Sequence, residues 1–328
     1  MGMEANSENL SHPQEFVLLG FSGLWELQNT LFAIFLILYL ITITGNATVI
    51  VLIHLDSRLH TPMYFFLSTF SLVETLVITT IIPRMLVDLL TEKKTISFTW
   101  CLTQFYFYFS LGLTDFLLLA AMSIDRYVAI CHPLHYSTIM SRHLCNSLVL
   151  GSLASAFLTM IPTTIWMARL SFCRSNVINH FFCDNVPLIK LSCSDTRPIE
   201  LWDFLLALIF ILSSLLVTII SYVAIISTIL RIPSASSQQK AFSTCASHFT
   251  VVVIGYGSTI FIYVRPSKGS SMDINKMLSL LTSVLTPLLN PFIFTLRNKK
   301  VKEVFRDRLW KLCVFLSTPA KKCCLPLV

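Results

Sequence analysis

Seven apolar stretches, each long enough to cross the ~30 Å hydrocarbon core of a bilayer, constrain this chain more than any other feature. A soluble domain carries about 25% charged residues, whereas 12% of this chain is charged and 55% is hydrophobic. The sequence therefore predicts an all-α membrane protein, a seven-transmembrane helix bundle. The expected spans cover residues 27–53, 62–89, 98–130, 144–166, 200–230, 241–264 and 274–297.

The distribution of Lys and Arg predicts the orientation of this bundle. Residues 1–26 contain neither residue type, whereas residues 297–328 contain nine of them. Because cytoplasmic flanks of spans are enriched in Lys and Arg, we expect a multi-pass protein of the cell membrane with an extracellular N-terminus and a cytoplasmic C-terminus. The expected parts are an extracellular segment over 1–26, a transmembrane domain over 27–297, and a cytoplasmic amphipathic helix and tail over 298–328. Asn9 begins a glycosylation sequon on the predicted outer side.

The tail after Arg297 combines helical spacing of apolar residues with many basic ones. The apolar positions are Val301, Val304, Phe305, Leu309, Leu312 and Phe315. This pattern predicts a short amphipathic eighth helix on the anionic inner leaflet. The net charge of +7 is concentrated here, which favours a lipid surface over nucleic acid as the partner. Cys313, Cys323 and Cys324 are candidate palmitoylation sites, with unmodified thiols as the equal alternative.

Glu74 places a carboxylate within the second apolar stretch, where a charge costs at least ~2.5 kcal/mol. Counted from the cytoplasmic ends of their helices, Glu74 lies about 18 Å up its span and Asp115 about 16 Å up the third span. Asn46 and Asn290 are expected slightly below them. Two buried acids at one depth do not both stay charged without a cation, so the sequence predicts a site that shares a proton or binds Na⁺. The alternative is two unrelated polar residues that line a water pocket.

Five ordered motifs mark the ends of the spans. They read GN at 45–46, PMYFFLS at 62–68, MSIDRYVAICHPLHY at 122–136, KAFSTCASHF at 240–249 and PLLNPFIFTLRN at 287–298. From EFVLLGF at 15–21 to Lys300, the chain resembles the odorant receptors, which are rhodopsin-like G-protein-coupled receptors. The resemblance implies a non-enzymatic receptor that binds a small volatile odorant within the bundle. It also implies a heterotrimeric stimulatory G protein that raises cAMP.

The same resemblance implies an activation switch at the inner ends of the spans. Asp125 and Arg126 would hold the inactive state, and Arg126 would meet the C-terminal helix of the G protein once the helices separate. The remaining members of this set are Tyr222, Lys240, His248, Asn290 and Pro291. The alternative is an interfacial pair whose arginine extends to the lipid headgroups. The family usually has Tyr where this chain has Phe294, so one inner hydroxyl is absent.

The two buried acids also depart from the family pattern. Receptors of this kind usually have Asp on span two and Glu on span three, whereas this chain has Glu74 and Asp115. The combined reach of the two side chains is unchanged. We interpret the difference as a compensated exchange that preserves the sodium- or proton-holding site, and we expect no other cofactor.

Four cysteines fall in segments predicted on the outer, oxidising side, where they suggest two disulfides. They are Cys101, Cys173, Cys183 and Cys193. Three pairings are possible, and the spacing does not choose among them. The resemblance favours Cys101–Cys183 with Cys173–Cys193, and Cys101–Cys193 is the alternative. His180, Cys183 and Asp184 have side chains suited to a soft metal, but a disulfide-bonded sulfur is not a ligand, so no metal site is expected.

A small-molecule site is expected between the outer halves of the helices. The candidate residues are Tyr108, Phe109, Gly112 and Leu113 on span three, Tyr256, Thr259, Ile260 and Tyr263 on span six, and Phe210, Leu280 and Ser283 on spans five and seven. Ordinary helix packing is the alternative for each. Residues 102–114 contain no acid to hold an amine, and residues 277–297 contain no lysine to form a Schiff base. We therefore expect a neutral, mainly apolar ligand.

Two other functions compete with an odorant receptor. One is a non-olfactory chemosensory receptor expressed in another tissue, which the sequence does not distinguish. The other is an ion or proton transporter that uses Glu74 and Asp115. Transporters are commonly built from inverted repeats with broken helices, and the sequence has no recognisable repeat of this kind.

Overall fold

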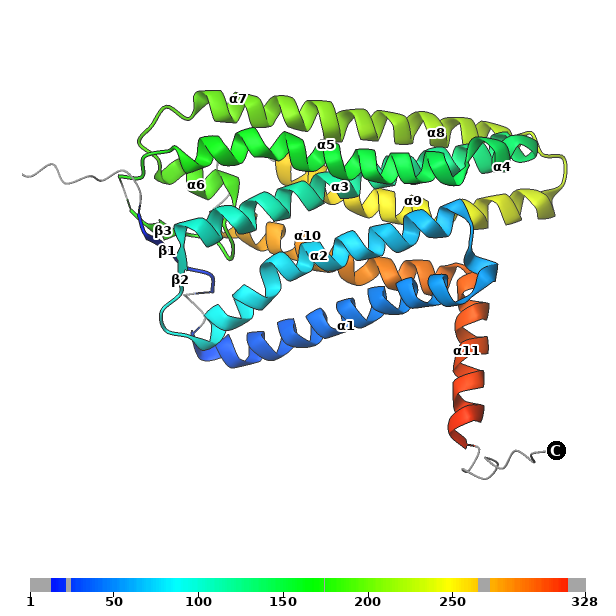
Figure 1. Cartoon of the computed structure of the whole chain (residues 1–328), viewed down its shortest axis with the longest axis horizontal. Helices are drawn as coiled ribbons and strands as arrows, with labels where there is room; N and C mark the ends of the chain where they lie inside the picture. Colours follow the sequence, from blue (N-terminus) through cyan, green and yellow to red (C-terminus); the bar gives the residue numbers. More distant parts are fainter. Residues whose placement is uncertain (1–12, 22–24, 174, 265–271, 318–328) are drawn as a thin grey trace, which may run out of the picture.

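The long helices of the protein run side by side as one elongated bundle (Figure 1). The computed structural model describes residues 13–21, 25–173, 175–264 and 272–317. Within these residues, seven long helical segments form the bundle, and the predicted helical membrane bundle is confirmed. They are α1 (Gln28–Leu55), α2 (Pro62–Leu90), α3 (Phe98–Cys131), α5 (Arg142–Ala168), a continuous segment made of α7 (Arg197–Leu206), η4 (Ala207–Leu212) and α8 (Ser213–Leu230), α9 (Ala235–Val264) and α10 (Met272–Arg297).

Five of these segments, counted over the described residues, are long and apolar enough to cross a membrane. They are α1, α2, α3, α5 and the continuous segment Arg197–Leu230. Large apolar side chains cover their outer faces: Leu150 and Leu158 on α5 are each 65% exposed, and Ile220 on α8 is 66% exposed. An apolar surface this extensive is stable when lipid, rather than water, surrounds it.

Local sequence sets the ends of several helices. Pro62 occupies the first turn of α2, where its missing N–H is not needed. Ser97 and Ser141 cap α3 and α5, because their hydroxyl oxygens accept hydrogen bonds from backbone N–H groups in the first turns. Helix α9 begins at Ala235, six residues before the apolar stretch, since hydropathy marks where the chain is apolar and not where the helix starts.

The prolines of α10 explain how α1 docks against it. Pro291 has no N–H, so the carbonyl of Pro287 loses its helical partner. Asn46 Nδ2 of α1 donates to this carbonyl at 3.3 Å. A Cβ on Gly45 would lie 3.0 Å from Pro291 Cγ, so glycine is what allows the two helices to approach this closely. The pair Gly45 and Asn46 therefore fixes α1 on the proline-containing segment of α10.

One end of the bundle, called here the disulfide end, is closed by a small sheet and two disulfides. The sheet has the order β2 (Thr95–Ser97), β1 (Glu15–Leu18), β3 (Val177–Ile178), with β1 antiparallel to β2 and parallel to β3. Cys101 is bonded to Cys183 and Cys173 to Cys193, which is the pairing that the resemblance favours. The loop between α5 and α7 also contains the short helix α6 (Asn185–Leu191).

A buried lysine joins three segments at the disulfide end. Lys276 Nζ of α10 donates to the carbonyl of Gly20 and, at 3.0 Å, to Asn179 Oδ1. It also lies 4.9 Å from the centre of the Phe181 ring. The N-terminal segment after β1 is thus tied to both the long loop and α10.

The opposite end, called here the Arg126 end, carries short helices and a helix that leaves the bundle. The short elements at the Arg126 end are η2 (Ser57–Leu59), η3 (Pro133–His135) and α4 (Tyr136–Ile139). A further short element, η1 (Trp25–Leu27), precedes α1 at the disulfide end. Helix α11 (Lys299–Ser317) lies where the amphipathic helix is expected. Figure 1 shows it turning sharply away from α10 and extending past the end of α1.

Candidate ligand site and activation switch

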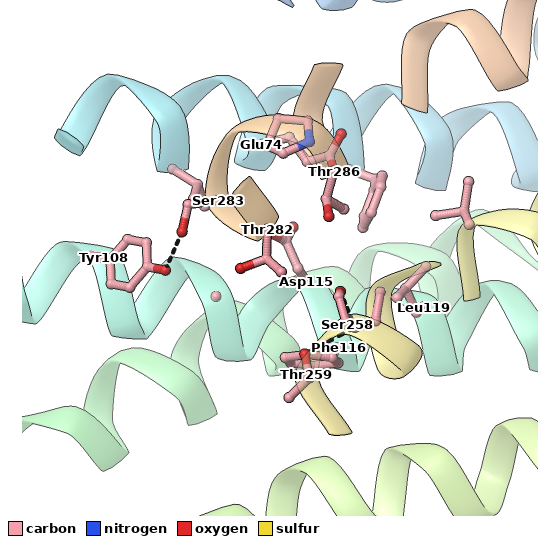
Figure 2. Close-up of a pocket in the computed structure, with 16 residues that line it drawn as sticks. Glu74, Tyr108, Asp115, Phe116, Leu119, Ser258, Thr259, Thr282, Ser283 and Thr286 are labelled. Atoms are coloured by element: carbon pink, nitrogen blue, oxygen red, sulfur yellow. Dashed lines mark hydrogen bonds between the residues drawn. The ribbon is translucent and has the colours of Figure 1, made fainter. Parts of the chain in front are cut away.

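A cavity of about 150 Å³ lies between α2, α3, α9 and α10. Its wall combines aromatic rings, hydroxyl groups and two carboxylates (Figure 2). The residues that line it are Phe70, Glu74 and Val77 of α2, Tyr108, Gly112, Asp115, Phe116 and Leu119 of α3, Val251, Gly255, Ser258 and Thr259 of α9, and Thr282, Ser283, Thr286 and Pro287 of α10.

Four of the predicted ligand residues lie in this wall: Tyr108, Gly112, Thr259 and Ser283. The hydroxyl groups of Tyr108 and Ser283 share a hydrogen bond of 2.8 Å that joins α3 to α10 (Figure 2). A Cβ added to Gly112 would meet no atom within 4 Å. The glycine therefore leaves open space on the cavity side of α3.

Five other predicted ligand residues do not line the cavity. Phe109 and Leu113 follow wall residues by one position, and a helix turns by about 100° per residue, so they pack into the core at the disulfide end. Tyr256 lies behind the wall, with its ring 5.2 Å from that of Phe116. Leu280 packs in an apolar cluster with α2 residues, and Phe210 lies outside the wall on the π-helical segment η4.

The side chains of Ile260 and Tyr263, the remaining predicted ligand residues, lie outside the described residues, as does Asn9.

Sequence reasoning missed three hydroxyl residues of the wall, Ser258, Thr282 and Thr286. Ser258 and Thr282 donate to carbonyls of their own helices, at 2.6 and 2.9 Å. Their oxygens keep lone pairs that can accept a hydrogen bond from a ligand. Extending the predicted face of α10 by one turn toward the Arg126 end, from Ser283 to Thr286, would have found Thr286, whereas Ser258 and Thr282 directly precede the predicted Thr259 and Ser283 and needed the positions of the neighbouring helices.

The two acids, Glu74 and the partly buried Asp115, face the same cavity from α2 and α3 (Figure 2). Glu74 is 1% exposed, and its Oε1 accepts a hydrogen bond from Asn290 Nδ2 of α10. Among the described residues, Glu74 Oε2, Asp115 Oδ1 and Asn290 Oδ1 are buried without a hydrogen-bond partner. The structure thus brings three of the four predicted residues together. Asn46 is not in this group: its Nδ2 donates to the carbonyls of Thr42 and Pro287, and its Oδ1 is also buried without a partner in the described part of the chain.

The predicted switch pair lies buried at the Arg126 end of α3. Arg126 Nε donates to Asp125 Oδ2 at 3.0 Å, and the hydroxyl of Tyr136 donates to Asp125 Oδ1 at 2.7 Å. Burial and the neighbouring Asp125 raise the pKa of Tyr136, so its hydroxyl stays protonated as a donor. Asp125 therefore holds both an arginine and a tyrosine, and the role of Tyr136 was not predicted.

Two of the other predicted switch residues, Tyr222 and His248, contact each other. The hydroxyl of Tyr222 and Nδ1 of His248 share a hydrogen bond of 2.7 Å between α8 and α9, so Tyr222 pairs with His248 in this arrangement, and not with Arg126. Lys240 is exposed near the start of α9. Phe294, which replaces the usual tyrosine, is buried edge-on against Phe70 with ring centres 6.5 Å apart.

The candidate metal ligands in the long loop, His180, Cys183 and Asp184, do not form a metal site. Cys183 is disulfide-bonded, and His180 Nε2 lies 3.8 Å from Asp184 Oδ2. Burial lowers the pKa of His180, which keeps the ring neutral. Within the described residues, no group of three or more His, Cys, Asp or Glu side chains could hold a metal ion.

Comparison with known proteins places this chain in a family. Residues 35–311 match the olfactory receptor family. Human olfactory receptor 6F1 is 52% identical over 303 residues, which cover 92% of this chain and 98% of that protein. Human olfactory receptors 6T1 and 6S1 are 51% and 48% identical, over 93% and 94% of this chain and 94% of each relative. The seven-helix bundle, the buried Asp125–Arg126 pair and these matches agree, and the chain belongs to the olfactory receptor family, whose members are G-protein-coupled receptors for odorants and not enzymes.

Proposed function

We propose that this receptor binds a small, neutral, mainly apolar odorant in the cavity between α2, α3, α9 and α10, and activates a stimulatory G protein that raises cAMP. The observation that carries the proposal is that one helix, α3, contributes both the cavity wall and the switch. Gly112 and Arg126 lie about 21 Å apart along this helix. A ligand that shifts α3 against its neighbours therefore acts directly on the Asp125–Arg126 pair.

The size and lining of the cavity support the ligand class. An engineered apolar cavity of about 150 Å³ in another protein holds a benzene ring, and the cavity here has the same volume. Phe70 and Phe116 provide apolar contact, and the oxygens of Ser258 and Thr282 can accept one hydrogen bond each. A shared proton or a bound Na⁺ would cancel one of the two negative charges of Glu74 and Asp115 and so weaken the attraction of the cavity for a cationic ligand.

Substitution of Gly112 tests the ligand site. Gly112→Leu should fill the cavity and raise the half-maximal odorant concentration by about tenfold or more, since 1.4 kcal/mol is tenfold in affinity. Gly257→Leu is the matched control, because a Cβ at Gly257 also meets no atom within 4 Å and the residue lies outside the wall. A cAMP reporter and a panel of neutral odorants and primary amines provide the measurement. An unchanged Gly112→Leu response, or an amine as the best agonist, would contradict the proposal.

Coupling to the G protein is tested at the other end of α3. Arg126→Ala should abolish odorant-evoked cAMP while leaving receptor at the cell surface. Arg142→Ala is the control, because Arg142 is an exposed arginine at the same end of the bundle. Full signalling by Arg126→Ala would remove Arg126 from the switch. If odorant raises a different second messenger instead of cAMP, the receptor couples to a G protein other than the stimulatory one proposed.

We also propose that Glu74 and Asp115 hold a shared proton or a sodium ion in the inactive receptor. Their unpartnered oxygens support this, because a buried polar atom without a partner costs about 1–3 kcal/mol. Glu74→Asp and Asp115→Glu alone should shift basal cAMP, whereas the double variant should restore it. Purely additive effects would show that the acids do not act as a unit. Basal activity that falls with added Na⁺ would favour the ion over the proton.

The proposed topology places residues 1–26 outside the cell, residues 27–297 in the membrane and residues 298–328 in the cytoplasm. The sheet supports this orientation, because β1 joins the N-terminal segment to the end that carries both disulfides, and disulfides persist on the oxidising side. Asn9→Gln should abolish the shift in gel mobility that a deglycosylating enzyme causes. If Asn9 stays unmodified while an epitope at the C-terminus is accessible from outside, the orientation is reversed.

A further inference from the structure

A second hollow lies outside the bundle, in the corner between α1, α10 and α11. This corner cleft has a volume of about 800 Å³ and is separate from the ligand cavity. Figure 1 shows the corner where α11 turns away from α10 and passes α1. Its apolar wall includes Ile41, Phe292, Phe305 and Leu309. Lys302 and Arg306, with one acid, Glu303, line it from α11.

An ion-pair network holds α11 in place and so preforms the corner cleft. Asp56, just after α1, accepts hydrogen bonds from Arg58 Nε at 2.9 Å and from Arg308 Nη2 at 3.3 Å. Arg58 also donates to Asp307 Oδ2 at 2.8 Å, and Arg308 donates to the carbonyl of Leu55 at 2.6 Å. Two arginines and two acids thus connect α11 to the end of α1.

The basic residues of the corner cleft are not part of this network. Both Lys302 and Arg306 are exposed, and neither takes part in an ion pair among the described residues. Glu303 balances one of the two positive charges. The cleft therefore keeps a net positive charge at its α11 side, which suits an anionic group.

The depth of the corner cleft matches a lipid that stands in one leaflet. On α1 the lining runs from Ile41 to Thr48, and the helix ends at Leu55. Thr48 lies about 10 Å and Ile41 about 21 Å along the helix from that end, whereas one leaflet contributes about 15 Å of hydrocarbon. The hydroxyls of Thr44 and Thr48 donate to carbonyls of their own helix. The hydroxyls of the α1 wall therefore need no polar partner from a ligand at this depth.

We propose that the corner cleft binds one anionic phospholipid of the leaflet on the Arg126 side. Its phosphate lies between Lys302 and Arg306, and one acyl chain lies against Phe292, Phe305 and Leu309. The proposal concerns a site apart from the odorant cavity and does not depend on which ligand or G protein the receptor uses.

Lipid retention by the purified full-length receptor tests this proposal. The receptor in detergent is titrated with phosphatidylserine or phosphatidylcholine, and native mass spectrometry counts the bound lipids. We expect one phosphatidylserine to bind in preference to phosphatidylcholine. Each of Lys302→Gln and Arg306→Gln should weaken it about fivefold, since a basic residue near anionic lipid contributes about one kcal/mol. Lys300→Gln makes the same charge change on α11 at an exposed position outside the cleft and should leave binding unchanged.

A second pair of variants separates a bound lipid from general attraction of α11 to an anionic surface. Thr48→Trp fills the corner cleft without changing any charge and should also reduce phosphatidylserine binding at least fivefold. Val51→Trp places the same ring on the lipid-facing side of α1, where Val51 is exposed and outside the cleft, and should have no effect. Equal binding of phosphatidylcholine, an unaffected Thr48→Trp, equal losses in Lys300→Gln and Lys302→Gln, or a second receptor copy in place of the lipid would each overturn the proposal.

Discussion

The two ends of the bundle are held together by different kinds of interaction. At the disulfide end, two covalent bonds, a three-stranded sheet and the buried Lys276 join the N-terminus, the long loop and α10. At the Arg126 end, hydrogen bonds and ion pairs among the described residues hold α3, α4, α8 and α9 in place. One end is fixed by bonds that thermal motion does not break, and the other by contacts that can exchange.

This difference fits a receptor whose ends have different tasks. A native disulfide contributes about 2–5 kcal/mol, whereas a single hydrogen bond contributes about 0.5–1.5 kcal/mol, or about 1.5–3 when one partner is charged. A G protein can compete with a hydrogen bond of this strength, but it cannot replace a disulfide. Under the proposed function, the disulfide end would keep the shape around the cavity while the Arg126 end changes its partners.

The largest expected effect is loss of the disulfide between α3 and the long loop. Cys101 and Cys183 are 82 residues apart, whereas Cys173 and Cys193 are 20 apart. Loop-closure entropy then predicts losses of about 4.5 and about 3.3 kcal/mol. Cys101→Ala with Cys183→Ala should keep most receptor in the endoplasmic reticulum, and Cys173→Ala with Cys193→Ala should have a smaller effect. The ratio of receptor at the cell surface to total receptor and the thermal unfolding of the purified receptor provide the measurement. Normal surface levels of the variant that lacks Cys101 and Cys183 would contradict the contrast between the two ends.

A smaller effect is expected where Tyr136 contacts Asp125. Tyr136→Phe removes the 2.7 Å hydrogen bond to the carboxylate and leaves the apolar ring. Because a hydrogen bond to a charged group contributes about 1.5–3 kcal/mol, basal cAMP should rise severalfold with little change in surface level. Tyr127→Phe is the control, since its hydroxyl bonds to His132 at the same end. If the two variants behave alike, Asp125 does not depend on Tyr136.

The smallest expected effect is a pH dependence at the disulfide end. Burial lowers the pKa of His180, nearby Lys276 lowers it further, and Asp184 opposes both. The folded protein thus binds a proton here less readily than the unfolded chain, so this contribution to stability is complete above the unfolded pKa of about 6.5 and declines as pH falls below it. The melting temperature should drop slightly between pH 7.5 and pH 5.5. His180→Gln should reduce that drop, whereas His143→Gln, exposed at the Arg126 end, should keep it.

Much of the bundle could be predicted from the sequence, because long apolar stretches have few alternatives in a membrane. The meeting of Glu74 and Asp115 was also predictable, since each position follows from counting along a helix whose end is marked by a motif. The sheet was not predicted: its strands have two to four residues, and they pair across distant parts of the chain.

The sequence predicted less well which face of each helix lines the cavity. Spacing showed that Tyr108 and Phe109 lie on the same side, but only the positions of neighbouring helices decide which ring reaches the cavity. Tyr256 illustrates this, because α3 covers it through Phe116. The partner of the Pro287 carbonyl, Asn46, is 241 residues away, and no local sequence signal identifies it.

The contact of Gly45 and Asn46 with the proline-containing segment of α10 has a consequence for biosynthesis. It joins the first span to be made by the ribosome to the last one. Until Pro287 and Pro291 enter the membrane, Asn46 Nδ2 has only the Thr42 carbonyl of its own helix as a partner and lacks the Pro287 carbonyl, and an incompletely paired amide in an apolar medium is costly. The contact between α1 and α10 can therefore form only after the last span has been made, and a nascent chain truncated before α10 would leave Asn46 without the Pro287 carbonyl.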